Sequence, residues 1–281
     1  MLTLEHGACH LSFRVVGDGP PVLFIQGVGV HGDGWLPQVE DLSRHYTCLS
    51  FDNRGMGRSQ PLGPKKLTVP LMALDALALA DELGWQDYHV VGHSLGGHIA
   101  TALALSSPNR VRSLALLSTS ACGRDMPPVT LSMMWTVLRS RLGTRRKRRH
   151  AFLEMVLPTE IRATQDLDNW AARLEPLFGH DLTDTPSVVV QQVRAYRAYD
   201  ATPRLGELKG IPTLVVSGAE DPIGPPALGR ALAERIPESR YHEIARASHG
   251  LTVTHHAEIN TLLSKHFSEA ESQRRAALMH E

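Results

Sequence analysis

The sequence predicts an α/β fold in which a largely parallel sheet is covered by helices on both faces. Short apolar runs rich in β-branched residues alternate with segments of helical period through most of the 281 residues. One of these runs leads directly into the glycine motif Gly92-His93-Ser94-Leu95-Gly96. Parallel strands need a crossover between them, and a helix is the usual one, so this alternation favours a parallel sheet.

The predicted strands are short apolar runs that end in turn residues or polar loops. The run Pro21–Ile25 is apolar throughout, as expected of a strand that is buried on both faces. In chain order the candidates are Leu11–Val16, Pro21–Ile25, Tyr46–Phe51, Tyr88–Val91, Val111–Leu117, Ile211–Val216 and Arg240–Ile244. Helical spacing predicts helices between them, and Gly84 is an ordinary stop for the helix Thr68–Leu83. The other predicted helices are Trp35–His45, the segment that follows Gly96, Ala227–Ile236 and His255–Phe267.

The segment 123–205 interrupts this alternation, because it has no strand pattern and only helix-like pieces. We therefore expect residues 1–122 and 206–281 to form one core, and residues 123–205 to form a helical cap inserted between two strands. Most bulky apolar side chains of the cap should pack within it, and a few should face the substrate. They are Met133, Met134, Trp135, Leu138, Phe152, Trp170 and Leu177, and Trp135 is the candidate substrate contact.

The composition gives no sign of a nucleic-acid or membrane partner. Lys+Arg and Asp+Glu both number 29, so no net charge attracts nucleic acid or an anionic membrane. The three cysteines, Cys9, Cys48 and Cys122, lack metal-site spacing and fit the reduced thiols of a cytoplasmic protein. The sequence shows neither a signal-peptide pattern nor an apolar run long enough to span a membrane. These observations predict a cytoplasmic protein without metal or cofactor.

The motif Gly92–Gly96 predicts a nucleophile elbow, because it lies between a strand and a helix. In such a turn Ser94 adopts a strained backbone conformation that exposes its hydroxyl, and the glycines avoid collisions with neighbouring backbone. The helix that follows directs its free N–H groups toward any oxyanion formed beside the serine.

A serine nucleophile needs a base and a carboxylate that orients the base. Asp221 follows the predicted strand Ile211–Val216, and His249 follows Arg240–Ile244 after a short loop. The chain order serine, acid, histidine is the one expected for a strand-to-helix elbow, so Ser94, Asp221 and His249 are the predicted triad. The competing acid is Glu220, and the competing histidines, which fall in a predicted strand or helix, are His242, His255 and His256.

These features together resemble the α/β-hydrolase superfamily, and the chain is identified as a cap-bearing, carboxylesterase-like member. The resemblance covers nearly the whole length, from the loop after Ile25 through the polar loop 52–59 and the elbow to His249. It implies an eight-stranded, mostly parallel sheet with the active site between core and cap.

The resemblance also implies an oxyanion hole formed by the backbone N–H groups of Val28 and Leu95. Members of the superfamily usually carry His-Gly before this position, whereas this chain has Gln26-Gly27. Backbone donation does not depend on that side chain, and the Gln26 amide becomes a candidate substrate contact.

A basic run in the predicted cap stands apart from the otherwise balanced sequence. It holds seven cations and no acid between Arg139 and Arg149. Such a run is ordinarily a solvated helix face. An anionic partner surface, or a negatively charged substrate steered toward the entrance, is the alternative.

The favoured interpretation is a cofactor-free serine hydrolase acting on an ester or related acyl bond of a small organic molecule. Two alternatives use the same triad, namely C–C bond hydrolysis and perhydrolase or haloperoxidase-type chemistry. A further alternative belongs to another class of protein, a ligand-sensing receptor with a hydrolase fold and slow turnover. The fold by itself does not decide among them.

Overall fold

The computed structural model describes residues 1–63, 66–125, 135–136 and 138–278. Within these residues the chain forms one eight-stranded sheet with the order β1-β2-β4-β3-β5-β6-β7-β8. The strands are β1 Leu2–His6, β2 Cys9–Val16, β3 Pro21–Ile25, β4 Thr47–Phe51, β5 Tyr88–His93, β6 Val111–Leu117, β7 Thr213–Gly218 and β8 Arg240–Ile244. The pairs β1–β2 and β2–β4 are antiparallel and all other pairs are parallel, so the predicted fold class is confirmed.

The sequence-based prediction missed one strand, β1, and placed the other seven close to their observed bounds. β1 is an edge strand whose residues are mostly exposed, and it pairs only with β2. An exposed edge strand buries little on either face, so its sequence carries little of the apolar pattern that marks the inner strands.

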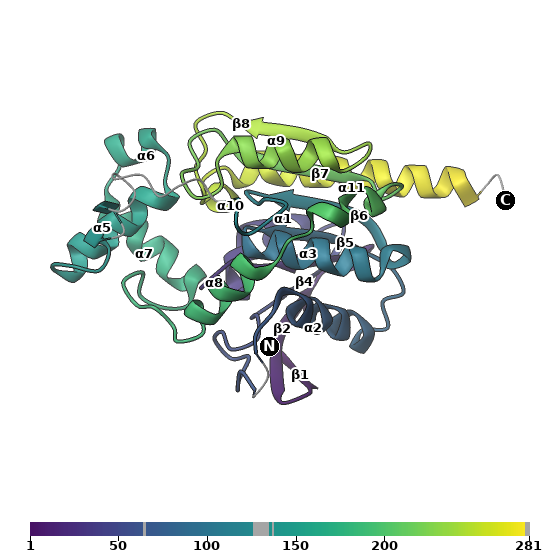
Figure 1. The fold of residues 1–281 in the computed structure, drawn as a ribbon, viewed down its shortest axis with the longest axis horizontal. Coiled ribbons are helices and arrows are strands. Elements are labelled where there is room, and N and C mark those ends of the chain that lie inside the picture. The colour runs from purple at the N-terminus through teal and green to yellow at the C-terminus, as the bar shows by residue number, and fades with distance from the viewer. Residues whose placement is uncertain (64–65, 126–134, 137, 279–281) are drawn as a thin grey trace.

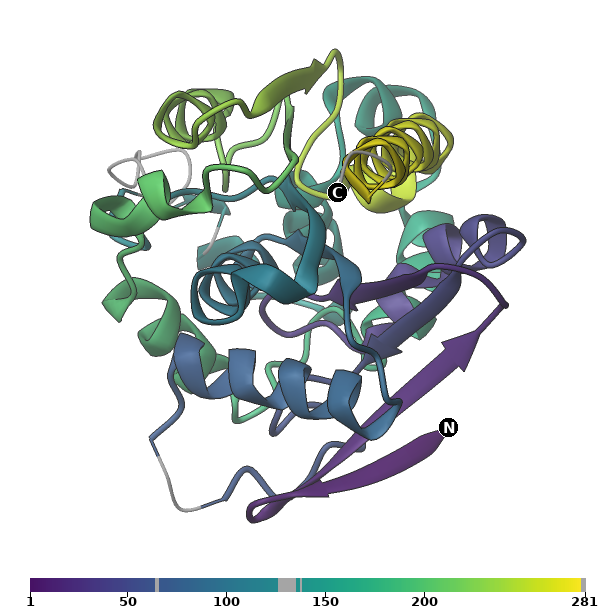
Figure 2. The same cartoon turned by 90° about the vertical axis from the view of Figure 1, so that its right-hand side faces the viewer.

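Helices cover both faces of the sheet. Those of the core are α1 Leu36–Leu42, α2 Val69–Glu82, α3 Leu95–Ser106, α9 Pro226–Arg235, α10 Leu251–Thr254 and α11 His256–Leu278. Short 3-10 helices lie at η1 Gly32–Trp35, η2 Pro108–Arg110 and η3 Thr202–Leu208. Figure 2 shows α2, α3 and α9 on one side of the sheet and α1 and α11 on the other. The final helix continues past the predicted end at Phe267. The prediction stopped there because the last turns of the helix are largely exposed and lack an apolar period.

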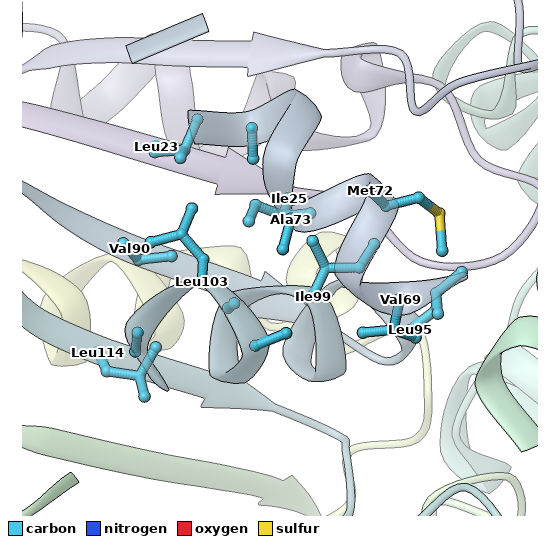
Figure 3. Packing of buried hydrophobic residues seen from close by; sticks show 14 of the residues in the cluster. Leu23, Ile25, Val69, Met72, Ala73, Val90, Leu95, Ile99, Leu103 and Leu114 are labelled. Atoms are coloured by element: carbon cyan, nitrogen blue, oxygen red, sulfur yellow. The ribbon is translucent and has the colours of Figure 1, made fainter. Parts of the chain in front are cut away.

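Two apolar clusters fill the spaces between sheet and helices. In the first, Ile99 and Leu103 of α3 pack beside Met72 of α2 over Val90 and Leu114 of the sheet (Figure 3). The second lies on the opposite face, under α1 and α11. The sheet is thus buried on both sides, which explains why its inner strands are largely apolar.

The segment between β6 and β7 forms the helices α5 Arg145–Val156, α6 Thr159–Thr164, α7 Leu167–Phe178 and α8 Val189–Ala198. We call residues 123–205 the insertion. Figure 1 shows α5, α6 and α7 gathered at one end of the molecule, the end toward which β8 points. The chain leaves and returns side by side, because Gly123 N donates to Tyr199 O at 3.0 Å and Ala201 N donates to Ala121 O at 3.0 Å. Helical spacing in the sequence also marks Val129–Leu142 within the insertion, and half of that segment lies outside the described residues.

Candidate active site

The turn between β5 and α3 holds Ser94 in a strained backbone conformation, with φ 55° and ψ −120°. This region favours glycine, so a serine there must be held by its surroundings. The turn is also crowded, because a Cβ on Gly92 would lie 2.2 Å from Gly96 O and one on Gly96 would lie 2.0 Å from Ile25 O. The two motif glycines are therefore required by the close approach of backbone, as the sequence predicts.

Asp221 and His249 form a buried hydrogen-bonded pair beyond the ends of β7 and β8. His249 Nδ1 lies 2.8 Å from Asp221 Oδ2, and the other carboxylate oxygen accepts from the N–H groups of Ile223 and Gly224, both at 2.8 Å. Burial raises the pKa of Asp221. The interaction with His249 and the hydrogen bond from Gly224 N–H lower the pKa by more than burial raises it, so it lies below its ordinary value. Because the ionised carboxylate only accepts, Nδ1 of His249 is the nitrogen that donates to Asp221, and in the neutral ring Nε2 is left as an acceptor.

His93, inside the elbow motif, holds the backbone of His249. Its Nε2 lies 2.9 Å from His249 O, and because a carbonyl only accepts, that nitrogen donates. Burial, together with the neighbouring His249, lowers the pKa of His93 to about 3. A neutral imidazole therefore fixes the His249 backbone without adding a charge.

Ser94 and His249 line the same cavity, which has a volume of about 530 Å³. Among the described residues, no hydrogen bond joins Ser94 Oγ to His249. Hydrogen bonds between a nucleophile and its base are often long or poorly aligned before substrate binds, so shared exposure to one cavity is the relevant geometry.

The loop after β3 lies against the elbow. Gln26 is buried, lines the cavity, and accepts at Oε1 from Gly27 N at 2.9 Å, while its backbone O accepts from Asn53 Nδ2 at 2.8 Å. Within the described part of the chain, the backbone N–H groups of Val28 and Leu95 have no hydrogen-bond partner. Both remain available as donors.

Two residues of the insertion hold Gly29, the neighbour of Val28, and sequence reasoning missed both. Gly29 N donates to Gln192 Oε1 at 2.9 Å, and Gly29 O accepts from His180 Nε2 at 2.8 Å. Gln192 is fully buried on α8. No local signal marks these residues, because the contact joins positions 163 apart in the chain.

The loop after β4 lies outside the cavity lining. Asp52 Oδ1 accepts from Gly32 N at 2.8 Å, and Arg54 Nε donates to Asp75 Oδ2 at 2.9 Å in a buried pair. His98, on α3, is buried beside the rings of Tyr196 and Tyr199. These polar residues brace loops and helices.

The insertion supplies one wall of the cavity, and the predicted contact Trp135 does not belong to it. The Trp135 side chain is 60% exposed and lies outside the cavity lining, so the helical spacing did not reveal its direction. Trp170 packs inside the insertion, Leu138 is 46% exposed, and Met133 and Met134 lie outside the described residues. Of the predicted set, Phe152 and Leu177 line the cavity.

The described residues offer neither a metal site nor a membrane-spanning helix. No group of three or more His, Cys, Asp or Glu side chains there is arranged to hold a metal ion. None of the helices formed by residues 1–63, 66–125, 135–136 and 138–278 combines the length and apolar character needed to cross a bilayer.

Comparison with known proteins places the chain in a family. A family model described as the alpha/beta hydrolase fold matches residues 20–255. The chain belongs to the α/β-hydrolase fold family. A protein of Azorhizobium caulinodans named as the carbamate hydrolase RutD is 29% identical over 248 residues, with 88% of this chain and 90% of the relative covered. A Mycobacterium tuberculosis protein named as the non-heme bromoperoxidase BpoC is 28% identical, with 94% and 99% covered.

Solved structures agree with this family assignment. The enol-lactonase of Burkholderia xenovorans superposes with a TM-score of 0.78 at 25% identity, over 95% of this chain and all of that one. The protein is accordingly a hydrolase of the α/β-hydrolase fold. The relatives differ in the bond their names refer to, so the family assignment leaves the substrate of this α/β hydrolase open.

Proposed function

We propose that this α/β hydrolase is a serine hydrolase that cleaves an ester or related acyl bond of a small organic molecule. The observation that carries the proposal is the buried Asp221–His249 hydrogen bond beside the cavity that the strained Ser94 also lines. A nucleophile, a base and an orienting carboxylate at one cavity are the groups that acyl transfer needs.

In the proposed reaction, His249 Nε2 takes the proton of Ser94 Oγ as that oxygen attacks the acyl carbonyl. Asp221, ionised because its pKa is lowered, holds the imidazole tautomer and stabilises the imidazolium. The imidazolium then protonates the leaving group, and His249 activates a water that releases the acyl group from Ser94.

The oxyanion of the tetrahedral intermediate would be bound by the N–H groups of Val28 and Leu95. The Leu95 donor lies at the first residue of α3, where the helix dipole also favours negative charge. Loss of one such donor commonly costs about 3 kcal/mol of transition-state stabilisation. We further propose that the insertion acts as a cap, since Phe152 and Leu177 line the cavity that Ser94 enters.

The names of the relatives support acyl chemistry without choosing a substrate. Carbamates and enol-lactones, to which two of those names refer, both offer a carbonyl carbon to a nucleophile. An ester, a lactone and a carbamate pass through similar tetrahedral intermediates, so one site of this kind serves all three.

A second candidate function is perhydrolase or haloperoxidase-type chemistry on the same serine. The similarity to a protein named as a non-heme bromoperoxidase favours it. In this reaction hydrogen peroxide replaces water as the acceptor of the acyl group, and the product is a peracid.

Labelling and turnover test the proposal together. A fluorophosphonate should add one adduct to the protein by intact-mass spectrometry, and Ser94→Ala should abolish both the adduct and the hydrolysis of p-nitrophenyl esters. Labelling that persists in Ser94→Ala would reject the serine assignment. Labelling without multiple turnovers would favour a ligand sensor, and peracid formation with acetate and peroxide would favour the second candidate.

A further inference from the structure

Six of the seven cations of the basic run separate into two groups in the folded chain, and the seventh, Lys147, is exposed and lies outside the cavity lining. Four arginines of this run pair with carboxylates of the insertion. These pairs are Arg139–Glu154 at 2.8 Å, Arg145–Asp184 at 3.3 Å, Arg146–Asp168 at 2.7 Å, and Arg149–Asp181. Most of the run is therefore neutralised within the insertion itself, as an ordinary surface ion-pair network.

Arg141 and Arg148 differ from those four, because both line the cavity that contains Ser94. Arg148 donates to Thr183 O at 2.7 Å and to Ser140 O at 3.4 Å, two uncharged carbonyls that leave its positive charge uncompensated. Among the described residues, Arg141 forms no ion pair with a carboxylate. The undescribed positions 126–134 and 137 contain no acidic residue in the sequence that could provide one.

A third arginine of the cavity lining comes from a separate element. Arg197, on α8, also lines the cavity and has no ion pair among the described residues. The one carboxylate in the described cavity lining, that of Asp184, is engaged by Arg145. The wall of the cavity thus has an excess of positive charge, although the whole chain has none.

Polarity changes along the cavity. Arg141 and Arg197 are exposed, which places them where the cavity opens to solvent, whereas Phe152 and Leu177 contribute partly buried apolar walls. A ligand that reaches from Ser94 to the opening would contact both the apolar walls and the exposed guanidinium groups. Guanidinium donors match the two oxygens of a carboxylate.

We propose that the cavity selects acyl compounds that carry a carboxylate at the end distant from the scissile bond, bound by Arg141, Arg148 and Arg197. The inference rests on the proposed serine hydrolase function and names its substrate class. Exposed ion pairs are weak one by one and are screened by salt, so the three together should favour the charged substrate by about tenfold at low ionic strength.

Matched substrates test this directly, since each pair has a similar shape but a different charge. In the acyl series, p-nitrophenyl hemiglutarate is compared with p-nitrophenyl pentanoate. In the alcohol series, 4-carboxyphenyl butyrate is compared with 4-methylphenyl butyrate. The measured quantity is the ratio of kcat/KM for the charged ester to that for the neutral ester.

The double variant Arg141→Gln/Arg197→Gln, which keeps Arg148, should lower this ratio about fivefold in at least one series, and 0.5 M NaCl should lower it in the wild type. These two arginines are chosen because Arg148 also bridges two loops and its loss could disturb them. Arg146→Gln is the matched control, since Arg146 is an exposed arginine of the same run outside the cavity lining. It should leave the ratio unchanged.

A ratio that stays at the wild-type value in the double variant, in both series, would overturn the inference. Failure of the underlying function would look different. In that case the neutral esters would not be hydrolysed and the fluorophosphonate would not label Ser94, whereas the present inference fails with labelling and neutral-ester turnover intact.

Discussion

The sheet core and the insertion are held together by different interactions. The core has an apolar cluster on each face of the sheet, with side chains such as Val90 and Leu114 fully buried. The insertion has one small apolar cluster, formed by Leu153, Val156, Leu157, Trp170, Ala171, Leu174 and Leu182. Around that cluster, arginine–carboxylate pairs join its helices and loops.

This difference separates two tasks. Ser94, Asp221 and His249 all come from the core, where close packing keeps their relative positions fixed. The insertion contributes cavity walls, and ion pairs at a surface tolerate rearrangement better than a packed interior does. Substitutions in the core site should therefore change the chemistry, and substitutions in the insertion should change how substrate and oxyanion are held.

The largest effect is expected at the core acid. Asp221→Asn should lower kcat about a thousandfold or more, because an asparagine no longer holds the His249 tautomer that leaves Nε2 free. Steady-state hydrolysis of a p-nitrophenyl ester, together with circular dichroism to confirm folding, measures this. Glu220→Gln is the matched control, since the Glu220 carboxylate accepts from Thr159 N at 2.7 Å on the surface of the insertion. A larger loss in the control would show that the acid is misassigned.

A smaller effect is expected where the insertion touches the core. Gln192→Leu removes the acceptor for Gly29 N and should lower kcat about tenfold with little change in KM, because the adjoining Val28 donor loses its alignment. The control Gln191→Leu alters the preceding residue of α8, which does not hold this loop. If Gln192→Leu lowers only the free energy of unfolding and leaves kcat unaltered, the contact is structural and the two regions act independently.

The smallest effect concerns acid stability. Burial lowers the pKa of His93 to about 3 and those of His98 and His266 to about 4, and all three belong to the core. As the pH falls from the ordinary value of 6.5 toward 4, the unfolded chain binds protons that the folded chain excludes, so the free energy of unfolding falls. Each such histidine contributes a slope of at most about 1.4 kcal/mol per pH unit.

His98→Gln should remove one of these contributions and make the decline shallower. Urea denaturation at pH values from 7.5 to 4.5 measures the slope. The exposed His45 provides the control His45→Gln, which should retain the wild-type slope. An unchanged slope in His98→Gln would mean that acid weakens the molecule through other groups.

Most of the core could be predicted because its signals are local. A buried strand is apolar throughout, as in Pro21–Ile25, and the elbow needs glycine at Gly92 and Gly96 because backbone passes within 2.2 Å of where their Cβ atoms would lie. The residues proposed for catalysis follow strands at positions that chain order reveals. Edge strand β1 lacked such a signal because most of its residues are exposed.

The sequence alone therefore determined the fold class, the elbow and the order of the residues proposed for catalysis, since each depends on neighbours along the chain. Tertiary structure alone decided which side chains of the insertion reach the cavity. In the folded chain Trp135 is exposed to solvent, and Gln192 and His180 contact Gly29. Arg141 and Arg148 line the cavity, whereas four neighbouring arginines form ion pairs. Helical period gives the spacing of side chains on a helix, but the direction of each face depends on how the helices pack, and residues far apart in the chain set that packing.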